Sequence, residues 1–472
     1  MKEKILCLKE KYQTNPGWYW LLATIFLFPI LPEYISPFIL FAGFIVFKRQ
    51  WTREGRKAKV GTLGKMMMVF MSLSLISVFW SDTKFSTFST AMLWWGMFLI
   101  EVMIYNLART RQKIDKILYA MVISGALNGL VGAIQICTYT LYKFGHISNK
   151  FVLTTPFYRH LDETIYSILP FEINTSAWVT RASGFFSNPN LLATYMIIVY
   201  PISIYLFLNA TDKKKRITLF VFNILISAGI SSTMTRAGCF IAIVGWLFMF
   251  VILVKRHWKP LIEIFIPTII VIIPSMLTRY GLIFKTVGKY TGSGSGGAEA
   301  KKSSIAHFQI WESLIDYLST HIKAFLFGIG FGVEQTGQVL ANDYNLNKPH
   351  AHNFVLETWM ELGIIGVILL FVIIMCAFGK LLEINANNGK KFTLVFCVFT
   401  STITYLLFGL TDYIFNSPKQ IILLFIMLGL TQAMSYCYEK TIIHNPETLR
   451  EAAAKEIDNA IHQKPIPVKK NK

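Results

Sequence analysis

The amino-acid sequence predicts an all-α protein that spans a membrane about twelve times and has two long outer loops. Of its 472 residues, 54% are hydrophobic and 15% are charged, and the mean hydropathy of +0.48 is well above that of an average soluble domain. Apolar runs of about 20 residues, the length that crosses a bilayer, recur between polar breaks. The basic residues gather in alternate connections, as expected for cytoplasmic loops.

The apolar runs give the spans in order along the chain. The first two runs are short and broken by prolines, whereas the later runs are longer and continuous. The predicted spans are 18–32, 34–47, 66–80, 86–107, 114–138, 189–209, 217–233, 238–254, 260–278, 354–378, 392–411 and 420–438. Most of the 46 Lys and Arg residues then fall on the inner side, so both termini are expected in the cytoplasm.

Composition excludes several other classes of protein. The same charge bias accounts for the net charge of +20, so no nucleic-acid partner is expected. The first apolar run is followed by further runs and by no small-residue cleavage site, so it is not interpreted as a signal peptide. The six cysteines fall in predicted spans or on the inner side, and they indicate neither a disulfide framework nor a metal knuckle.

The spans and loops divide the chain into six parts. They are an N-terminal five-span bundle at 1–138, a first long outer loop at 139–188, a central four-span bundle at 189–278, a second long outer loop at 279–353, three C-terminal spans at 354–438 and a cytoplasmic tail at 439–472. Long loops in a compact helical protein are usually functional or disordered. Any chemistry is therefore expected on the outer face.

The second outer loop is predicted to contain an amphipathic helix. Apolar residues recur there at helical spacing, at Ile305, Phe308, Trp311, Leu314, Ile315, Leu318 and Ile322. Such a helix lies on the membrane or on the helix bundle. Packing is the favoured role for the apolar side chains themselves.

The densest group of polar residues stands at the start of the tenth span. Asn353 is suited to cap this helix, and Asn353, Glu357 and Glu361 share one of its faces. Carboxylates that enter a membrane helix must face a partner or a polar cavity. His350 and His352 precede the helix, and a histidine held there could act as a general base near neutral pH.

Two alternatives stand beside this interpretation of the histidines. They could be zinc ligands, but His307, His321 or Asp343 would have to supply a further ligand, and none has a diagnostic spacing. They could also be ordinary loop histidines, which is the more frequent case for an isolated His-x-His pair.

Two arginines are candidates for binding phosphate. Arg181 precedes Asn188 and Pro189, which suit the cap and the first position of the sixth span. Arg236 lies in a very short outer turn, against the charge bias of the loops. Arginine is suited to bidentate phosphate contacts. For either residue alone, the phosphate of a lipid headgroup is an equally good partner.

One glycine run invites a different interpretation. Gly328, Gly330 and Gly332 resemble part of a dinucleotide-binding loop, but they follow an amphipathic helix on the outer face, so we interpret them as a turn. The sequence contains no P-loop, HExxH or GxSxG pattern.

These motifs together resemble those of the bacterial O-antigen ligases and Wzy-type polysaccharide polymerases, which are membrane glycosyltransferases with a GT-C-like fold. The ligase pattern of a histidine and a polar residue, nine further residues and Gly-x-x-Gly is met by His352, Asn353, Gly363 and Gly366. Other family motifs resemble Phe186–Asn190, Thr235–Gly238 and Gly328–Gly332. The resemblance covers about residues 180–380 in ordered motifs.

The sequence departs from the family at one position. Family members commonly carry an arginine four residues before the tryptophan of the outer helix, where this chain has His307 before Trp311. The resemblance leaves a second phosphate-binding cation open, with Arg279, Lys301, Lys302 and a protonated His307 as candidates.

The resemblance implies transfer of a glycan from an undecaprenyl-diphosphate carrier to an acceptor hydroxyl on the outer leaflet of the bacterial plasma membrane, with no cofactor and no metal. It implies that Arg236, with Arg181 as a helper, stabilises the departing diphosphate. His352 would activate the acceptor hydroxyl, with His350 as the alternative base, and Asn353 and Glu357 would orient the histidine or bind sugar hydroxyls. A flippase and a chain-length regulator are candidate partners.

Polymerase is the favoured function, since nothing in the sequence favours a lipid A-core acceptor, and a ligase that moves finished polymer is the first alternative. A flippase or another transporter is the second, but transporters place ionisable groups near the midplane of the membrane. Here the polar groups gather at the outer boundary instead, and Glu101 alone lies well inside a predicted span.

Overall fold

The computed structural model describes residues 14–148, 151–154, 157–158, 181–288, 295–384 and 389–443. These ranges are helical, with no strand among them, which confirms the predicted all-α membrane class. The long helices are α2 (Pro16–Leu27), α3 (Ser36–Arg53), α4 (Thr62–Ile76), α5 (Lys84–Leu107), α6 (Arg111–Lys143), α8 (Pro189–Leu208), α9 (Lys213–Ser232), α10 (Arg236–Gly288), α11 (Ser295–Thr320), α14 (Phe354–Glu383), α15 (Gly389–Gly409) and α16 (Pro418–Ile443). Shorter elements are η1 (Ser77–Phe79), α12 (Ile322–Phe327), α13 (Val333–Tyr344) and η3 (Ile414–Asn416).

Each predicted span coincides with a helical segment. The spans predicted at 238–254 and 260–278 are the two arms of α10, which are separated by a kink at His257. Eight described helices are long and apolar enough to cross a membrane, and Pro16–Leu27 and Thr393–Gly409 are shorter apolar helices. A count of twelve spans therefore stays a prediction.

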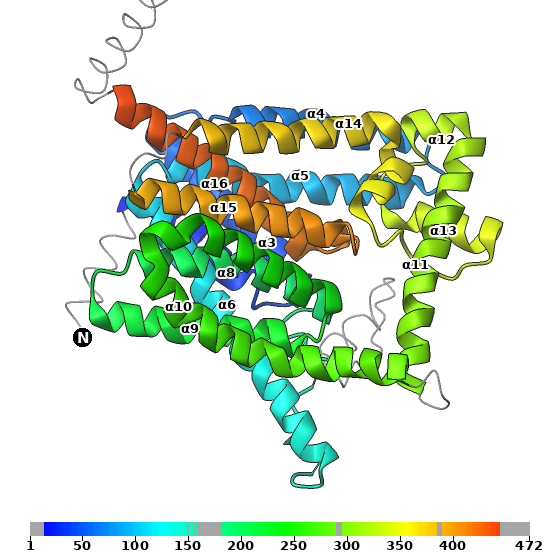
Figure 1. Ribbon diagram of the computed structural model, residues 1–472. Coiled ribbons are helices and arrows are strands. Elements are labelled where there is room, and N and C mark those ends of the chain that lie inside the picture. Colours follow the sequence, from blue (N-terminus) through cyan, green and yellow to red (C-terminus); the bar gives the residue numbers. More distant parts are fainter. Residues whose placement is uncertain are drawn as a thin grey trace, which may run out of the picture.

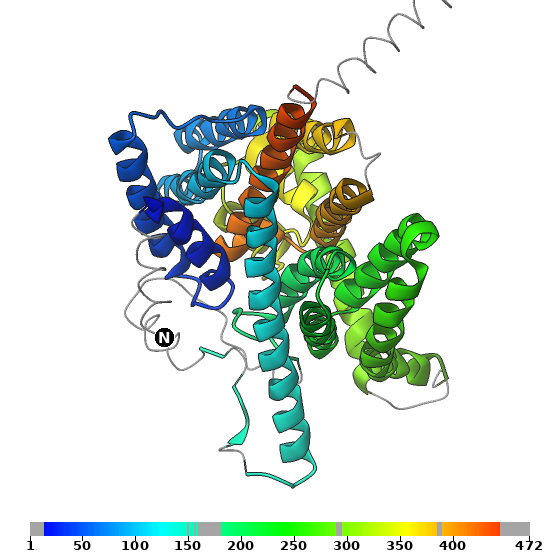
Figure 2. The ribbon, with the colours of Figure 1, turned by 90° about the vertical axis from the view of Figure 1, so that its left-hand side faces the viewer.

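The long helices form one bundle, and short helices gather at one end of it. Figure 1 shows α4, α5, α14, α15 and α16 running side by side, while α11 crosses their direction and lies with α12 and α13 at the same end. We call this end the α11 end. In the view turned by 90°, many of the long helices are seen end on, and α6 (cyan) is seen along its length (Figure 2). The first residues of the predicted tail at 439–472 belong to α16, whereas residues 444–472 and much of the first outer loop lie outside the described residues.

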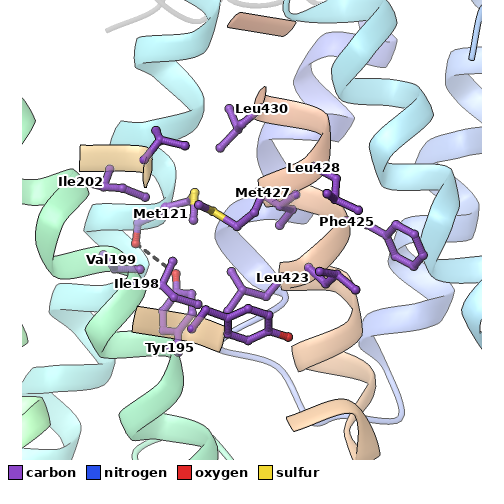
Figure 3. Close-up of a cluster of buried hydrophobic side chains, with 14 of the residues drawn as sticks. Met121, Tyr195, Ile198, Val199, Ile202, Leu423, Phe425, Met427, Leu428 and Leu430 are labelled. Atoms are coloured by element: carbon purple, nitrogen blue, oxygen red, sulfur yellow. Dashed lines mark hydrogen bonds between the residues drawn. The ribbon is translucent and has the colours of Figure 1, made fainter. Parts of the chain in front are cut away.

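The core is centred on α8, which is apolar on all sides and almost wholly buried, as expected of a helix surrounded by others. Figure 3 shows Tyr195 and Ile198 of α8 between Met121 of α6 and Leu423 of α16. The Tyr195 hydroxyl donates a hydrogen bond to the carbonyl oxygen of Met121 (3.0 Å). The buried phenol thus satisfies its polar atom and fixes the two helices against each other.

Helix caps position the candidate site as predicted. The side chain of Asn188 accepts hydrogen bonds from Asn190 N and Leu191 N (2.8 and 3.1 Å) at the start of α8, with Pro189 in the first turn. Asn353 likewise accepts from Val355 N and Leu356 N at the start of α14. Both caps satisfy amide groups that a helix cannot pair internally. Both helix starts that flank the candidate site are therefore fixed.

The glycine run is a turn, as predicted from the sequence. Gly328, Gly330 and Gly332 all have positive φ (76°, 126° and 119°), a conformation that side chains disfavour. The backbone amides of Ile329 and Gly330 donate to the carbonyl oxygens of Met360 and Glu361 (2.8 and 3.1 Å). The turn thereby holds α12 and α13 against the first turns of α14.

Candidate active site

His352 and Asp412 form a hydrogen-bonded pair at the α11 end. His352 precedes α14, whereas Asp412 lies in the connection between α15 and α16. His352 Nδ1 is 2.9 Å from Asp412 Oδ1. Because an ionised carboxylate can only accept, the Nδ1 atom carries a proton, and Nε2 is the ring nitrogen through which a proton can be accepted or released. This is the arrangement in which a carboxylate orients a histidine for acid–base chemistry.

A second contact holds the carboxylate of Asp412. The side-chain amide of Asn190, in the first turn of α8, donates to Asp412 Oδ2 (2.8 Å). Burial alone would raise the pKa of Asp412, but the hydrogen bond and charge of His352, together with His350 and the Asn190 amide, lower it. Asp412 is therefore ionised at neutral pH.

Arg181 continues this chain of contacts behind Asn190. One of its terminal nitrogens donates to Asn190 Oδ1 (2.7 Å) and to Thr235 Oγ1 (2.8 Å), and its Nε donates to the carbonyl oxygen of Thr233 (2.9 Å). Arg181 therefore joins the end of the first outer loop to the turn between α9 and α10. Because these contacts bind the guanidinium to protein groups, Arg181 influences His352 only indirectly, through Asn190 and Asp412.

Arg236 is placed differently. It is the first residue of α10 and is partly exposed, and within the part of the chain that the structure describes its guanidinium makes no hydrogen bond or ion pair. Its positive charge is close enough to lower the pKa of His307. Arg236 thus presents an unpaired cation beside the histidines.

His307 lies on α11 and faces His352, with the two ring centres 4.6 Å apart. Burial lowers the pKa of His307, and the nearby His352, Lys348 and Arg236 lower it further against the opposing effect of Asp412. A neutral His307 offers a hydrogen bond at neutral pH rather than a positive charge. It is therefore a weak substitute for the arginine that related sequences commonly carry there.

His350 packs against the other side of His352, with ring centres 4.2 Å apart. Its Nδ1 accepts the backbone N–H of His352 (3.2 Å), and the Asn416 amide lies 3.5 Å from its Nε2. Burial, aided by His352 and His307 against the opposing effect of Asp412, lowers the pKa of His350 to about 4. With Nδ1 occupied, the neutral ring carries its proton on Nε2. His350 is thus poorly placed to accept a second proton.

The same group has the composition of a metal site. Atoms of His350, His352 and Asp412 lie within 4.8 Å of one another, and imidazole with carboxylate suits zinc and similar ions. Sequence reasoning proposed His307, His321 or Asp343 as the added ligand, but the carboxylate comes from Asp412. His321 stacks on Tyr317 instead, with ring centres 4.2 Å apart. An ion would have to displace the hydrogen bond between His352 and Asp412, so the arrangement fits proton handling better.

Two carboxylates of α14 support the loop that carries the histidines. Glu357 is fully buried and accepts the backbone N–H of Ala351 (2.6 Å). Glu361 accepts the backbone N–H of Gly332 (3.1 Å) and the hydroxyl of Tyr413 (3.0 and 3.2 Å to its two oxygens). Both carboxylates therefore face protein partners rather than an open space for sugar hydroxyls.

Sequence reasoning singled out several of these residues and missed others. The structure brings His350, His352, Asn353 and His307 together, with Arg236 nearby, and it places Arg181 behind them. The side chain of Arg279 lies outside the described part of the chain. Asp412, Asn190 and Tyr413 were missed. The polar break Thr411-Asp412-Tyr413 between two predicted spans was the available signal, since an acidic residue there needs a partner.

Fold and site together define a polytopic membrane protein with an acid–base pair at one end of its helix bundle. Residues 221–371 match the family model described as O-antigen ligase, which supports the predicted O-antigen ligase and Wzy-type family. The match supports an enzyme of the O-antigen ligase or polymerase type. No curated protein matches the chain.

Proposed function

We propose that this protein is a glycosyltransferase that joins undecaprenyl-diphosphate-linked repeat units into a cell-surface polysaccharide. The observation that carries the proposal is the His352–Asp412 pair, together with the charge of Arg236 that acts on the adjacent His307. It combines a base with a cation, the two groups that glycosyl transfer from a diphosphate carrier requires. By the charge bias of the loops, the α11 end faces outward from the plasma membrane and both termini lie in the cytoplasm.

His352 is the proposed general base. The acceptor hydroxyl attacks the anomeric carbon of the donor sugar and transfers its proton to Nε2 of His352, while Asp412 stabilises the imidazolium that forms. The bond from the anomeric carbon to the phosphate oxygen breaks, and the electron pair leaves with undecaprenyl diphosphate. A positioned base of this kind contributes roughly 10²–10⁴-fold to the rate.

Arg236 is the proposed partner of the leaving group. Its guanidinium matches the geometry of phosphate oxygens. Negative charge develops on the diphosphate as the glycosidic bond breaks, and a fixed cation lowers the free energy of that state. Arg181 serves as a positioning residue, because it acts on Asp412 through Asn190.

A ligase that transfers finished polymer to a terminal acceptor is the second candidate. The family description favours it, since the matching model is named for the ligases. The two functions use the same donor and the same chemistry and differ only in the acceptor.

The test uses cells that lack the protein and cells that carry only His352→Asn or Arg236→Ala. Asn tolerates the positive φ of residue 352, so His352→Asn removes the base with little disturbance of the loop. We expect loss of long surface glycan and accumulation of single lipid-linked repeats in all three strains. Wild-type protein and His321→Ala, which changes an exposed histidine away from the pair, are the controls.

Other glycan profiles would contradict the proposal in distinct ways. Long polymer that stays on the lipid carrier would show a ligase. Repeats trapped on the cytoplasmic leaflet, with His352→Asn behaving as wild type, would show a transporter and remove the proposed chemistry.

A further inference from the structure

The described side chains of helix α11 fall into three neighbouring sectors around its axis. At about 100° per residue, Ile310, Leu314 and Leu318 share one side, and all three are buried against the protein. Next around the helix come Trp311, Ile315 and Phe308, and beyond them Glu312, Asp316 and Gln309. The apolar stripe predicted from the sequence is thus two stripes, and packing explains only the first.

The second stripe is apolar and uncovered. Phe308 is 65% exposed and Ile315 is 56% exposed. Trp311 is partly buried, packs on Phe308 with ring centres 5.5 Å apart, and donates its indole N–H to the carbonyl oxygen of Ala351 (2.8 Å). An amphipathic ring with one polar contact is typical of tryptophan at a membrane interface.

The uncovered stripe continues onto apolar surface of the bundle. Ile322, Leu326 and Phe327 of α12 are all exposed. Phe327 contacts Trp80, next to η1, with ring centres 6.4 Å apart. Beyond this contact, Phe79 is 84% exposed and Phe85 is 81% exposed. Phe79 ends one candidate membrane span and Phe85 is the second residue of the next, so the stripe leads to the exposed apolar surface of two candidate spans.

We infer that α11 and α12 form an interfacial elbow whose apolar stripe is immersed in the hydrocarbon of one leaflet. The three sectors match the three surroundings of such a helix, namely protein, hydrocarbon and water. Figure 1 shows α11 crossing the direction of the spans, as a helix that lies in the membrane plane must. The exposed carboxylates of Glu312 and Asp316 occupy the sector beyond the apolar stripe, where they remain in water.

The elbow fixes the depth of the histidine site. His307, which faces His352, is the residue before Phe308. Immersion of Phe308 by about 5–10 Å, the usual depth of an interfacial helix, places His307 and His352 at the level of the lipid headgroups. This consequence rests on the proposed function, in which a lipid-linked diphosphate must reach the pair without leaving the membrane.

Site-specific photocrosslinking tests the elbow. A benzophenone amino acid replaces Phe308, Ile315 or Ile322 in the full chain, reconstituted in vesicles of phosphatidylethanolamine and phosphatidylglycerol with a radiolabelled tracer lipid. Gln309 and Asp316, on the polar sector of the same helix, are the matched control positions. We expect at least a five-fold greater yield of labelled lipid adduct at the apolar positions than at the controls.

Equal lipid yields at both sets of positions would overturn the inference. Adducts to a second copy of this chain would also overturn it, because the stripe would then be a protein interface. Crosslinking needs no catalytic turnover, so this test can fail while the proposed function stands. Conversely, an inactive His352→Asn protein should still give the wild-type pattern of adducts.

Discussion

His352 holds a backbone conformation that its side chain does not favour. Its φ of 51° is left-handed, and among the described residues other than glycine only Met234 and Asn345 share this feature. A conformation of this kind costs of order 1–3 kcal/mol and persists where surrounding contacts impose it. Glu357 supplies one such contact through the amide of Ala351, and the Asn353 cap supplies another. In this conformation the imidazole contacts Asp412.

Replacing Asp412 with Asn tests the role of its charge. An amide can still contact His352 but does not stabilise an imidazolium as a carboxylate does, so we expect the turnover number to fall on the order of 10²-fold or more. The KM for the donor should change little, because Asp412 orients the base and does not bind the carrier. Kinetics of purified Asp412→Asn protein would measure both constants.

Asp343→Asn, which changes an exposed carboxylate on α13, is the matched control. A rise in KM with an unchanged turnover number would show that Asp412 binds substrate instead.

His350 makes stability depend on pH. Its pKa is lowered to about 4 in the folded protein, against about 6.5 in an unfolded chain. The folded protein therefore takes up a proton at His350 less readily than the unfolded chain does. The stability that neutral His350 gives to the folded protein is complete above about pH 6.5 and is lost as pH falls toward 4. This difference corresponds to on the order of 3 kcal/mol.

We expect the melting temperature in detergent to fall between pH 7 and pH 4.5, and to fall less in His350→Gln protein. Equal falls in the two proteins would contradict the assignment. Asp412, whose pKa is lowered, adds a loss only below about pH 4.

At the scale of elements, α14 is bent where another backbone passes close to it. Gly363 has φ 67° and ψ −173° and interrupts the helix. A Cβ atom there would lie 2.2 Å from the carbonyl oxygen of Leu326, and one on Gly328 would lie 2.3 Å from that of Glu361. The first glycine of the Gly-x-x-Gly end of the ligase pattern thus has a physical reason, since α12 and α14 approach backbone to backbone at Gly363.

Gly363→Ala should destabilise the protein by at least about 3 kcal/mol, through backbone strain and overpacking together. We expect a much lower yield in the membrane fraction and a lower melting temperature. Gly379→Ala in the same helix is the control, since a Cβ there meets no atom within 4 Å. Similar behaviour of the two variants would show that α12 can move away.

The sequence predicted the helices better than it predicted the contacts of the candidate site. Hydropathy and caps such as Asn188 and Asn353 located the helices, because these signals are local. For the apolar stripe of α11, packing was the favoured role, but Phe308 and Ile315 are exposed, while Ile310, which the predicted stripe did not include, is buried. Periodicity alone does not distinguish a stripe that faces protein from one that faces lipid. Asp412 was missed because its contact with His352 joins residues 60 positions apart.

At the scale of the whole molecule, the connection from α15 to α16 joins distant parts of the chain. Asp412 contacts His352 and Asn190, Tyr413 contacts Glu361, and Ser417 donates to Glu33 (2.7 Å) at the end of the connection between α2 and α3. Three segments far apart in sequence, at the starts of α8 and α14 and between α2 and α3, thus meet at this connection. The geometry of the site depends on all of them.

Lys419 tests this dependence. It is fully buried, its ammonium donates to the carbonyl oxygen of Phe185 (2.8 Å), and it lies over the ring of Phe186 at 4.5 Å. Lys419→Met keeps the volume but leaves that carbonyl without its partner, at a cost of about 1–3 kcal/mol. Because Phe185 is in the segment that carries Arg181, we expect the melting temperature and the turnover number to fall together.

Lys323→Met, which changes an exposed lysine on α12, should leave both quantities unchanged. A stable but inactive Lys419→Met protein would instead point to a direct part in the reaction.

The residues of the candidate site are synthesised in sequence order, so Asp412 is added after Arg236 and His352. Arg236 and His352 leave the ribosome well before Asp412, which lies beyond the segment 221–371 that matches the family. A nascent chain that has inserted only as far as α14 therefore holds the cation and the base without the carboxylate that orients the base. We therefore expect competence only after the connection between α15 and α16 has been translated, so products terminated before it should not consume lipid-linked sugar.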